Sequence, residues 1–146
     1  MPNGDCPLDE CRELLSEQDW VLGWQALVTL RPRLSLEDFL RRKSRLQADG
    51  YHLVGIFNDD KVVSVASYTI SPHAFFEREM IIHDMSTLTG ESSKGYASKL
   101  LQFLDQLAIQ LNCGRTVLVS AKAAEFYTKN GYLAHATGLK KLHEKG

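Results

Sequence analysis

The stretch of sequence that decides the fold runs from residue 80 to residue 101 and reads MIIHDMSTLTGESSKGYASKLL. Its first half belongs to an apolar, β-prone segment, which predicts a strand over Glu79–Leu88. Gly90–Ala97 is a loop of small residues. A long helix follows, because leucines recur at intervals of four, three and four residues from Leu100 to Leu111. The stretch therefore predicts a strand, a loop and a helix in direct succession.

The loop before the predicted helix is suited to an anion. The first backbone N–H groups of a helix have no partner within the helix and lie at the positive end of its dipole, which favours a group such as pyrophosphate. Gly95 and Ala97 carry no bulky side chain that would hold phosphates away from the backbone, and Lys94 adds a positive charge. The spacing is neither G-x-G-x-x-G nor G-x-x-x-x-G-K-[ST], which counts against a dinucleotide or ATP. By itself the pattern also fits an ordinary helix start with tight packing.

Before this stretch, the sequence predicts a strand, two helices and a β-hairpin. Ser16 and Ser35 are each followed three residues later by an aspartate, a variant of the capping box that begins a helix. The predicted elements are an edge strand over Glu10–Leu15, a helix from Ser16 to Arg31-Pro32, a helix from Ser35 to Asp49-Gly50, strands over Tyr51–Phe57 and Lys61–Ile70 joined by a turn at Asn58-Asp59-Asp60, and a break in the chain at Ser71-Pro72-His73.

After the stretch, the sequence predicts a strand, a helix and a last strand. Thr116–Val119 is short and almost wholly apolar, like strands that are buried on both faces of a sheet. Ala121–Asn130 is expected to be helical, and Tyr132–Thr137 is expected to form the last strand. The whole order is strand, two helices, three strands, helix, strand, helix, strand, which predicts a mixed α/β sandwich.

Length and composition fit one compact domain over residues 1–146, with 44% hydrophobic and 24% charged residues. The formal net charge of −1 gives no electrostatic case for a nucleic acid or an anionic membrane as partner. The sequence lacks a secretory signal and any apolar run of membrane-spanning length. Its three cysteines are an odd and sparse set without a nearby Cys/His cluster. We therefore expect a cytoplasmic protein with reduced thiols and no metal.

Two motifs together resemble the GNAT superfamily of N-acetyltransferases. Residues 80–101 resemble the strand–loop–helix core of that family, whose acetyl-CoA loop has the pattern [Arg/Gln]-x-x-Gly-x-[Gly/Ala]. Gly95 and Ala97 match this pattern, whereas Ser92 stands where the family usually has Arg or Gln. Residues 123–132, AAEFYTKNGY, resemble the family's other motif, an aromatic pair followed by Lys-Asn-Gly and an aromatic residue. The two motifs stand in the right order, and the resemblance covers roughly the last two-thirds of the chain.

The resemblance implies a GNAT-like mixed, mostly antiparallel twisted sheet flanked by helices, with acetyl-CoA as the acetyl donor and no metal. It implies that backbone N–H groups of Met85, Ser86 and Thr87 hold the thioester carbonyl, as in an oxyanion site. The implied contacts to the rest of the coenzyme come from Ser92, Ser93, Lys94, Gly95, Tyr96, Ala97 and Ser98. Because most phosphate contacts in this motif are made by the backbone, Ser92 affects the expected affinity for coenzyme A more than the existence of the site.

The resemblance also implies two catalytic side chains. Tyr127 is the candidate general acid that protonates the departing thiolate; the alternative is a packed core tyrosine. Strand alternation places His83 on the same face as Met85, beside the expected thioester, and histidine is the side chain that ionises near neutral pH. His83 is therefore the candidate base, with Glu79 and Asp84 as weaker candidates and a structural histidine as the alternative.

The acceptor is an amine, of either a small molecule or a protein, and the sequence does not rank the two. The first helix pair, its two tryptophans and the loop Ser71–Arg78 are expected to wall its site. Two other functions remain open at this point: a catalytically inactive acyl-CoA-binding sensor or partner module, and an adaptor domain without a ligand. The resemblance leaves a homodimer open as well, although no pattern in the sequence indicates where its interface would lie.

Overall fold

The computed structural model describes residues 10–91, 94–118, 124–134 and 139–143. In chain order, its elements are β1 (Glu10–Glu13), α1 (Glu17–Leu27), α2 (Leu36–Ala48), β2 (His52–Asn58), β3 (Lys61–His73), β4 (Glu77–Thr87), α3 (Tyr96–Gln110), β5 (Arg115–Leu118) and α4 (Ala124–Lys129).

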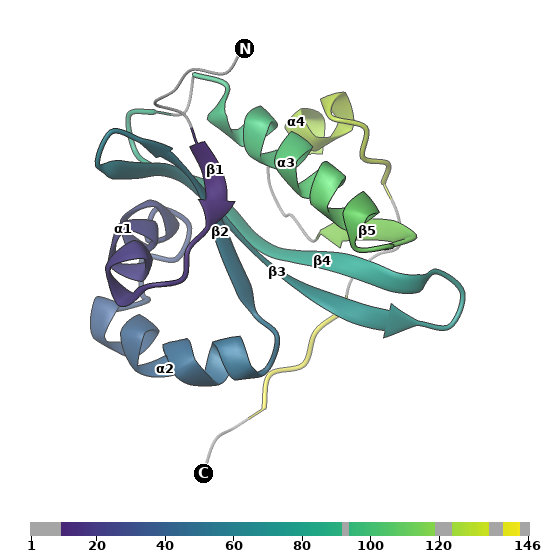
Figure 1. Ribbon diagram of the computed structural model, residues 1–146, viewed down its shortest axis with the longest axis horizontal. Helices are drawn as coiled ribbons and strands as arrows, with labels where there is room; N and C mark the ends of the chain where they lie inside the picture. The colour runs from purple at the N-terminus through teal and green to yellow at the C-terminus, as the bar shows by residue number, and fades with distance from the viewer. Residues whose placement is uncertain (1–9, 92–93, 119–123, 135–138, 144–146) are drawn as a thin grey trace.

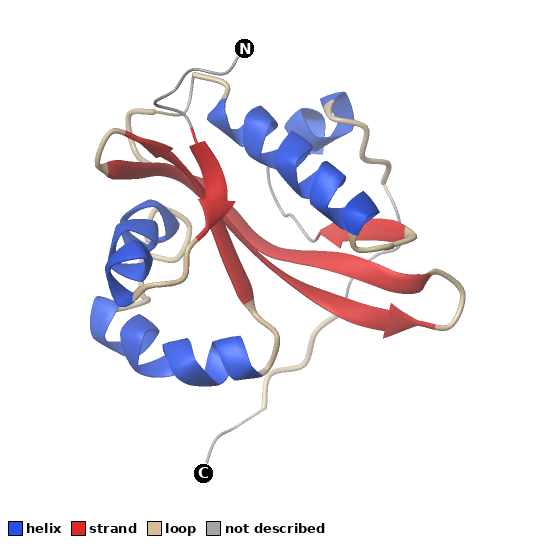
Figure 2. Cartoon of the chain, viewed as in Figure 1, coloured by secondary structure: helices blue, strands red, loops and turns tan. Residues whose placement is uncertain are grey.

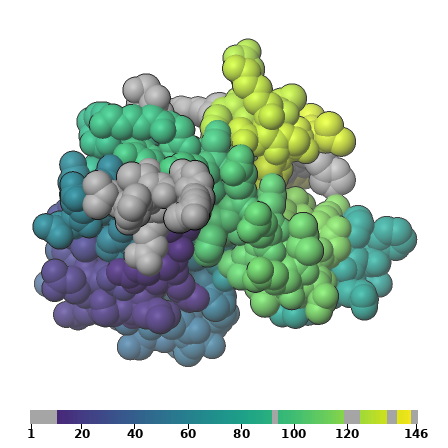
Figure 3. Space-filling view, turned by 45° about the horizontal axis from the view of Figure 1, so that its top comes forward, coloured from purple at the N-terminus to yellow at the C-terminus, as the bar shows by residue number. Residues whose placement is uncertain are grey.

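The five strands form one twisted sheet in the order β1-β2-β3-β4-β5 (Figure 1). The pairs β1–β2, β2–β3 and β3–β4 are antiparallel, and β4–β5 is parallel. Helices α1 and α2 cover one face of the sheet, and α3 covers the other (Figure 2). In the space-filling view, the yellow-green residues of α4 stand beside the green α3 (Figure 3). The expected mixed, mostly antiparallel sheet flanked by helices is confirmed.

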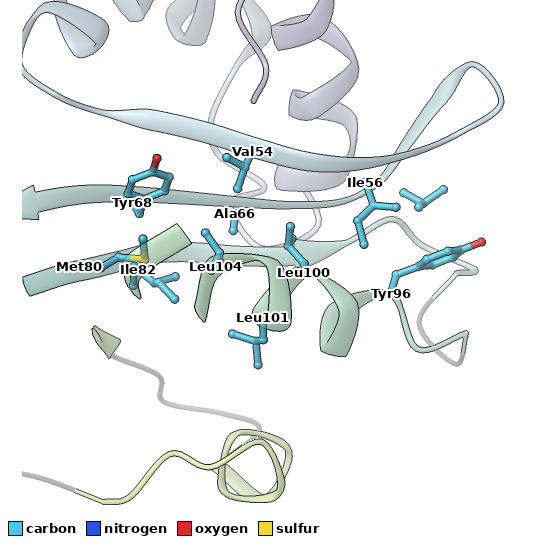
Figure 4. Close-up of a cluster of buried hydrophobic side chains, with 12 residues drawn as sticks. Val54, Ile56, Ala66, Tyr68, Met80, Ile82, Tyr96, Leu100, Leu101 and Leu104 are labelled. Carbon is cyan, nitrogen blue, oxygen red and sulfur yellow. The ribbon is translucent and has the colours of Figure 1, made fainter. Parts of the chain in front are cut away.

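Alternate side chains of the central strands supply two hydrophobic clusters, one on each face of the sheet. The α3-side cluster contains Val54, Ile56, Met80, Ile82, Leu100, Leu101 and Leu104 (Figure 4). The α1-side cluster contains Leu14, Trp20, Leu27, Phe39, Leu53 and Val65. Because both faces of β2 and β3 are covered, these strands are buried almost continuously rather than on alternate residues.

The predicted helix starts are confirmed. The Ser16 hydroxyl accepts a hydrogen bond from the Asp19 N–H at 3.0 Å, and the Ser35 hydroxyl accepts one from the Asp38 N–H at 3.0 Å. Each serine satisfies one of the N–H groups that a helix leaves unpaired at its start. The helix α1 ends earlier than expected, at Leu27, so that the segment between α1 and α2 is free to line a pocket described below.

The β3–β4 hairpin is longer than predicted. The expected break at Ser71–His73 is wrong, because β3 continues to His73 and Pro72 pairs with Arg78 of β4. Pairing with β2 ends at Tyr68, so only β4 flanks this part of β3 among the described residues. A proline is tolerated in such a strand when its nitrogen faces the edge that has no ladder.

Two C-terminal predictions also need correction. Tyr132–Ala134 is not a strand, and the remainder of the predicted last strand lies outside the described residues, as does the predicted start of α4 at residues 121–123. The strand β5 exists, but its four residues are half-buried instead of buried on both faces. In the described part of the chain β5 is an edge strand, which leaves one side of its backbone uncovered.

Candidate active site

A β-bulge interrupts β4 at its centre. Asp84 pairs with Ser67, but Ile82 pairs with Tyr68, so that His83 is one extra residue without an opposite partner in β3. A bulge of this kind bends a strand and changes which face the following side chains occupy.

The bulge reverses the alternation predicted for β4. Ile82 and Met85 both contact the α3-side cluster although they are three positions apart, which in a regular strand would place them on opposite faces, and Asp84 faces α1 and α2 instead. The expectation that His83 shares a face with Met85 is therefore wrong. The exposed His83 ring lies with its Nε2 2.8 Å from the Thr69 hydroxyl, on the α1 and α2 side of the sheet.

Past the bulge, one edge of β4 has no neighbouring strand among the described residues. Within residues 10–91 and 94–118, the last pair between β4 and β5 is Ile82 with Leu118, whereas pairing between β4 and β3 continues to Thr87. We refer to the edge of residues 83–87 that faces away from β3 as the open edge of β4. Such an edge offers backbone groups that a ligand can use in place of a strand.

The direction of each N–H group at the open edge follows from one ladder bond. The Leu88 N–H donates to the Val63 carbonyl at 2.8 Å, across the β3–β4 ladder. Successive N–H groups of a strand point to opposite edges, so the N–H of Ser86 also faces β3. The N–H groups of Met85 and Thr87 face the open edge. The Ser86 side chain is also engaged elsewhere, since its hydroxyl donates to the Ala26 carbonyl at 2.7 Å.

The start of α3 presents a second set of unpaired donors. Gly95, at φ 79°, occupies the position just before the helix, and the first helical bond runs from the Lys99 N–H to the Gly95 carbonyl at 3.2 Å. Within the described residues, the N–H groups of 96–98 have no acceptor, as expected at a helix start. The Tyr96 side chain is buried, and its hydroxyl accepts a hydrogen bond from Asn58 Nδ2 at 2.7 Å. Only the backbone of Tyr96 is therefore placed to meet a ligand.

Lys94 is not a free positive charge. Its Nζ lies 3.1 Å from Glu91 Oε1, and the Lys61 Nζ lies 3.7 Å from Glu91 Oε2. The hydrogen bond with Lys94 lowers the pKa of Glu91, and Glu91 in turn raises the pKa of Lys94. The two lysines outweigh the single carboxylate, so this group keeps one positive charge beside the start of α3. Ser92 and Ser93 lie outside the described residues.

Tyr127 lies half-buried on α4. Its ring makes edge-on contacts with Phe126 at 5.2 Å and with Tyr132 at 6.0 Å between ring centroids. Both Phe126 and Tyr127 pack against the α3-side cluster. Burial raises the pKa of Tyr127 above its usual value, and the phenol therefore keeps its proton at neutral pH.

A pocket of about 630 Å³ lies on the α1 and α2 side of the sheet, the face opposite to α3, between the α1–α2 connection, α2 and β4. Its lining combines apolar and aromatic side chains with three arginines and one aspartate: Leu27, Leu30, Arg31, Pro32, Arg33, Leu34, Phe39, Arg42, Leu46, Tyr51 and Asp84. Residues of the first helix pair line the pocket, whereas the two tryptophans and the loop Ser71–Arg78 do not. Trp20 is buried in a stack with Phe39 instead, at 4.7 Å between ring centroids.

A model of the acetyltransferase (GNAT) family matches residues 15–132 of the sequence. The chain belongs to the acetyltransferase (GNAT) family. A comparison with curated proteins finds no match. Solved GNAT-type structures share its fold: an acetyltransferase of Trypanosoma brucei has a TM-score of 0.78 at 22% identity, with 92% of this chain and 99% of that chain covered.

Two further solved structures show the same similarity. Glucosamine-6-phosphate N-acetyltransferase from Arabidopsis thaliana has a TM-score of 0.76 at 19% identity, with 93% of this chain and 99% of that chain covered. An aminoglycoside acetyltransferase from an uncultured soil metagenomic sample, in complex with sisomicin, has a TM-score of 0.79 at 13% identity, with 95% and 97% covered. At these identities, the similarity establishes the fold of this GNAT chain.

The described part of this GNAT chain contains no group of three His, Cys, Asp or Glu side chains placed to hold a metal ion. None of its helices combines the length and the apolar character that crossing a membrane requires.

The charged lining of the pocket is the feature of the candidate site that the sequence analysis did not predict. Arg33, Arg42 and Asp84 come together there from three separate segments, and no local motif joins them. The only sequence signal is the arginine pair that flanks Pro32 after the first helix.

Proposed function

We propose that the protein is an N-acetyltransferase that moves the acetyl group of acetyl-CoA to an amine by direct attack on the thioester. The observation that carries the proposal is the open edge of β4 next to the unpaired start of α3. An acyl carbonyl needs hydrogen-bond donors, and a pyrophosphate needs a cradle of N–H groups. Family membership and the amino compounds named for two similar structures, glucosamine-6-phosphate and an aminoglycoside, support an amine as acceptor.

The residues present fit the coenzyme. The N–H groups of residues 96–98 lack acceptors among the described residues, and a Cβ atom at Gly95 would meet nothing within 4 Å, so space is open in front of the helix start. Tyr96, Ala97 and Ser98 would bind phosphate through their backbone, with Lys94 adding charge. Ser92 and Ser93 are proposed to complete the loop. Bound there, acetyl-CoA supplies an activated acetyl group as a thioester.

The remaining steps belong to this chain's own groups. The N–H groups of Met85 and Thr87 polarise the acetyl carbonyl from the open edge. The amine nitrogen forms a bond to the carbonyl carbon, and the carbon–sulfur bond breaks. Tyr127 gives its proton to the departing thiolate, and His83 takes the proton that the amine loses, directly or through water. The products are an N-acetyl compound and free coenzyme A thiol.

Release of free thiol from acetyl-CoA in the presence of amines tests the proposal. We expect thiol release that depends on both the amine and the protein, together with an acetylated amine detected by mass spectrometry. Binding of acetyl-CoA without thiol release from any amine would point to an acyl-CoA-binding module instead. Absence of both binding and release would exclude the proposed function.

We expect Tyr127→Phe to lower kcat about 100-fold, because the thiolate would depart without a proton donor. The affinity for acetyl-CoA should stay the same, since the lost hydroxyl is assigned to the reaction alone. Steady-state thiol release and calorimetry measure the two quantities. Tyr132→Phe is the matched control: its hydroxyl is buried without a partner in the described part of the chain, so its removal should leave kcat unchanged. Equal kcat values for the two variants would remove Tyr127 from the mechanism.

We expect His83→Ala to lower kcat on the order of 100-fold at neutral pH, because a positioned base is lost from the acceptor side of the sheet. His143→Ala is the control, since this histidine lies in the exposed C-terminal segment. Steady-state rates at a saturating amine concentration measure the effect. A His83→Ala variant with full activity would show that bulk water accepts the proton.

A further inference from the structure

We propose that the pocket beside Asp84 selects an acceptor with three parts: a primary amine, an apolar body and an anionic group, as in an apolar amino acid. The proposal rests on the proposed function and names the class of acceptor that this chain takes. Its basis is the combination of unneutralised arginines with apolar walls in one pocket of small-molecule size.

The charge of the pocket is positive. Its lining holds three arginines and one carboxylate, Asp84. Arg31 binds that carboxylate through Nε at 2.8 Å and through Nη2 at 2.6 Å, both to Oδ1. The pair neutralises itself, which leaves Arg33 and Arg42 as an excess of positive charge with exposed side chains.

The two remaining arginines are available to a ligand. No hydrogen bond or ion pair joins either of them to another of the described residues. Asp38 interacts electrostatically with Arg42, but it is bound by Arg41 at 2.7 Å, and Arg41 is the main group that lowers the pKa of Asp38. A guanidinium binds a carboxylate or a phosphate with two parallel hydrogen bonds, so Arg33 and Arg42 suit either anion.

The walls of the pocket are apolar. Five side chains from α1, the connection and α2 supply them: Leu27, Leu30, Leu34, Phe39 and Leu46. Tyr51 adds a ring whose burial raises the pKa of its hydroxyl to about 12, so this group remains an uncharged donor. A volume of about 630 Å³ fits a small molecule with a hydrocarbon body.

The same features exclude a polycation. A diamine or polyamine needs carboxylates for its second charge, and the only carboxylate in the lining, Asp84, is already bound to Arg31. Two exposed guanidinium groups would repel it further. The lining therefore discriminates between amines by the sign of the group that accompanies the amino group.

The position of the pocket connects it to the reaction. Asp84 lines the pocket, and Met85, the next residue, directs its N–H to the open edge. The exposed His83 ring lies on the same face as Asp84. An acceptor whose anionic group is held by Arg33 and Arg42 thus extends its amino group toward the bulge, where the carbonyl is proposed to lie.

The test compares L-leucine with leucinol, its uncharged alcohol, with the phosphonate analogue of leucine, and with 1,5-diaminopentane. We expect kcat/KM for leucine to exceed that for leucinol about tenfold or more, because a charge-assisted contact is lost in leucinol. Diaminopentane should be the poorest of the four. A higher kcat/KM for the phosphonate than for leucine would identify a phosphate-type anion as the preferred group. A higher kcat/KM for leucine would identify a carboxylate. Either result supports an anionic acceptor, provided that both compounds exceed leucinol.

The test variant combines Arg33→Gln and Arg42→Gln in one protein, and Arg45→Gln is its control. Arg45 lies on α2 as well, is exposed, and binds Asp49 outside the pocket. The double variant should lose the preference for leucine about tenfold through KM, with kcat at saturation retained, whereas the control should keep it. Added salt should weaken leucine binding and leave leucinol unaffected.

Calorimetry with leucine alone separates this proposal from the proposed function. If no amine releases thiol, but leucine binds and the double variant abolishes its binding, the pocket is confirmed and the acetyl transfer is wrong. If thiol is released, but leucinol or diaminopentane is preferred and the arginine variants change nothing, the acceptor class is wrong and the proposed function stands. No leucine binding and no preference for it would overturn the inference.

Discussion

Gly95→Gln is expected to abolish binding of acetyl-CoA, with a rise in Kd of about 100-fold or more. The reason is that Gly95 directly precedes the helix α3, where its φ of 79° turns the chain into the first helical turn. A glutamine side chain at this point would project into the space where we propose the pyrophosphate to lie. Loss of two charge-assisted hydrogen bonds to the N–H groups of residues 96–98 is enough for an effect of this size. Titration of acetyl-CoA by calorimetry measures it.

Gly50→Gln is the control for the backbone strain of this substitution. Gly50 has a φ of 92°, lies at the end of α2, and offers the same open space to a new side chain, since neither position has an atom within 4 Å of a built Cβ. Both variants should lose about 1 kcal/mol of stability, because a side chain disfavours a positive φ. Only the Gly95 variant should lose the ligand. Normal affinity in that variant would remove the start of α3 from the coenzyme site.

The sequence predicts those parts of the molecule that local patterns determine. Each helix-capping serine and the leucine spacing of α3 lie within a few residues of the element that they define, and the structure confirms them. The order β2-β3-β4 follows from the short connections between these strands, so their antiparallel arrangement is also accessible from the sequence.

The parts that the sequence does not predict depend on long-range contacts. Perfect alternation is expected of Met80–Thr87, and only the pairing with β3 shows that His83 is an extra residue. The burial of the Tyr96 side chain cannot be predicted for a similar reason, because its hydroxyl is hydrogen-bonded to Asn58, which belongs to the distant strand β2. A strand register, unlike a helix cap, is decided by its neighbour.

The pocket illustrates the same limit at a larger scale. Arg33 and Arg42 belong to the segment after α1 and to α2, whereas Asp84 belongs to β4, about a third of the chain away. Their individual charges are visible in the sequence, but the excess of positive charge appears only once Arg31 is seen to bind Asp84. The acceptor class is consequently a structural inference, whereas the family follows from motifs.

Met85→Pro is expected to lower kcat by about 100- to 1000-fold, the range measured when one donor is removed from an oxyanion site. Proline lacks an N–H group, and at this position the lost N–H faces the open edge instead of the ladder with β3. A proline in such a position leaves the sheet intact. The affinity for acetyl-CoA should change little, because the start of α3 is proposed to hold the phosphates.

Met85→Ala is the control that separates the N–H group from the side chain. Met85 is half-buried against the α3-side cluster, so both variants lose this packing and should show a similar fall in thermal stability. The alanine variant keeps the N–H group and should keep most of its kcat in the thiol-release assay. If the two variants are equally slow, the loss comes from packing. If the alanine variant alone is fast, the backbone N–H at the open edge takes part in the reaction, because this group is what the proline removes and the alanine keeps.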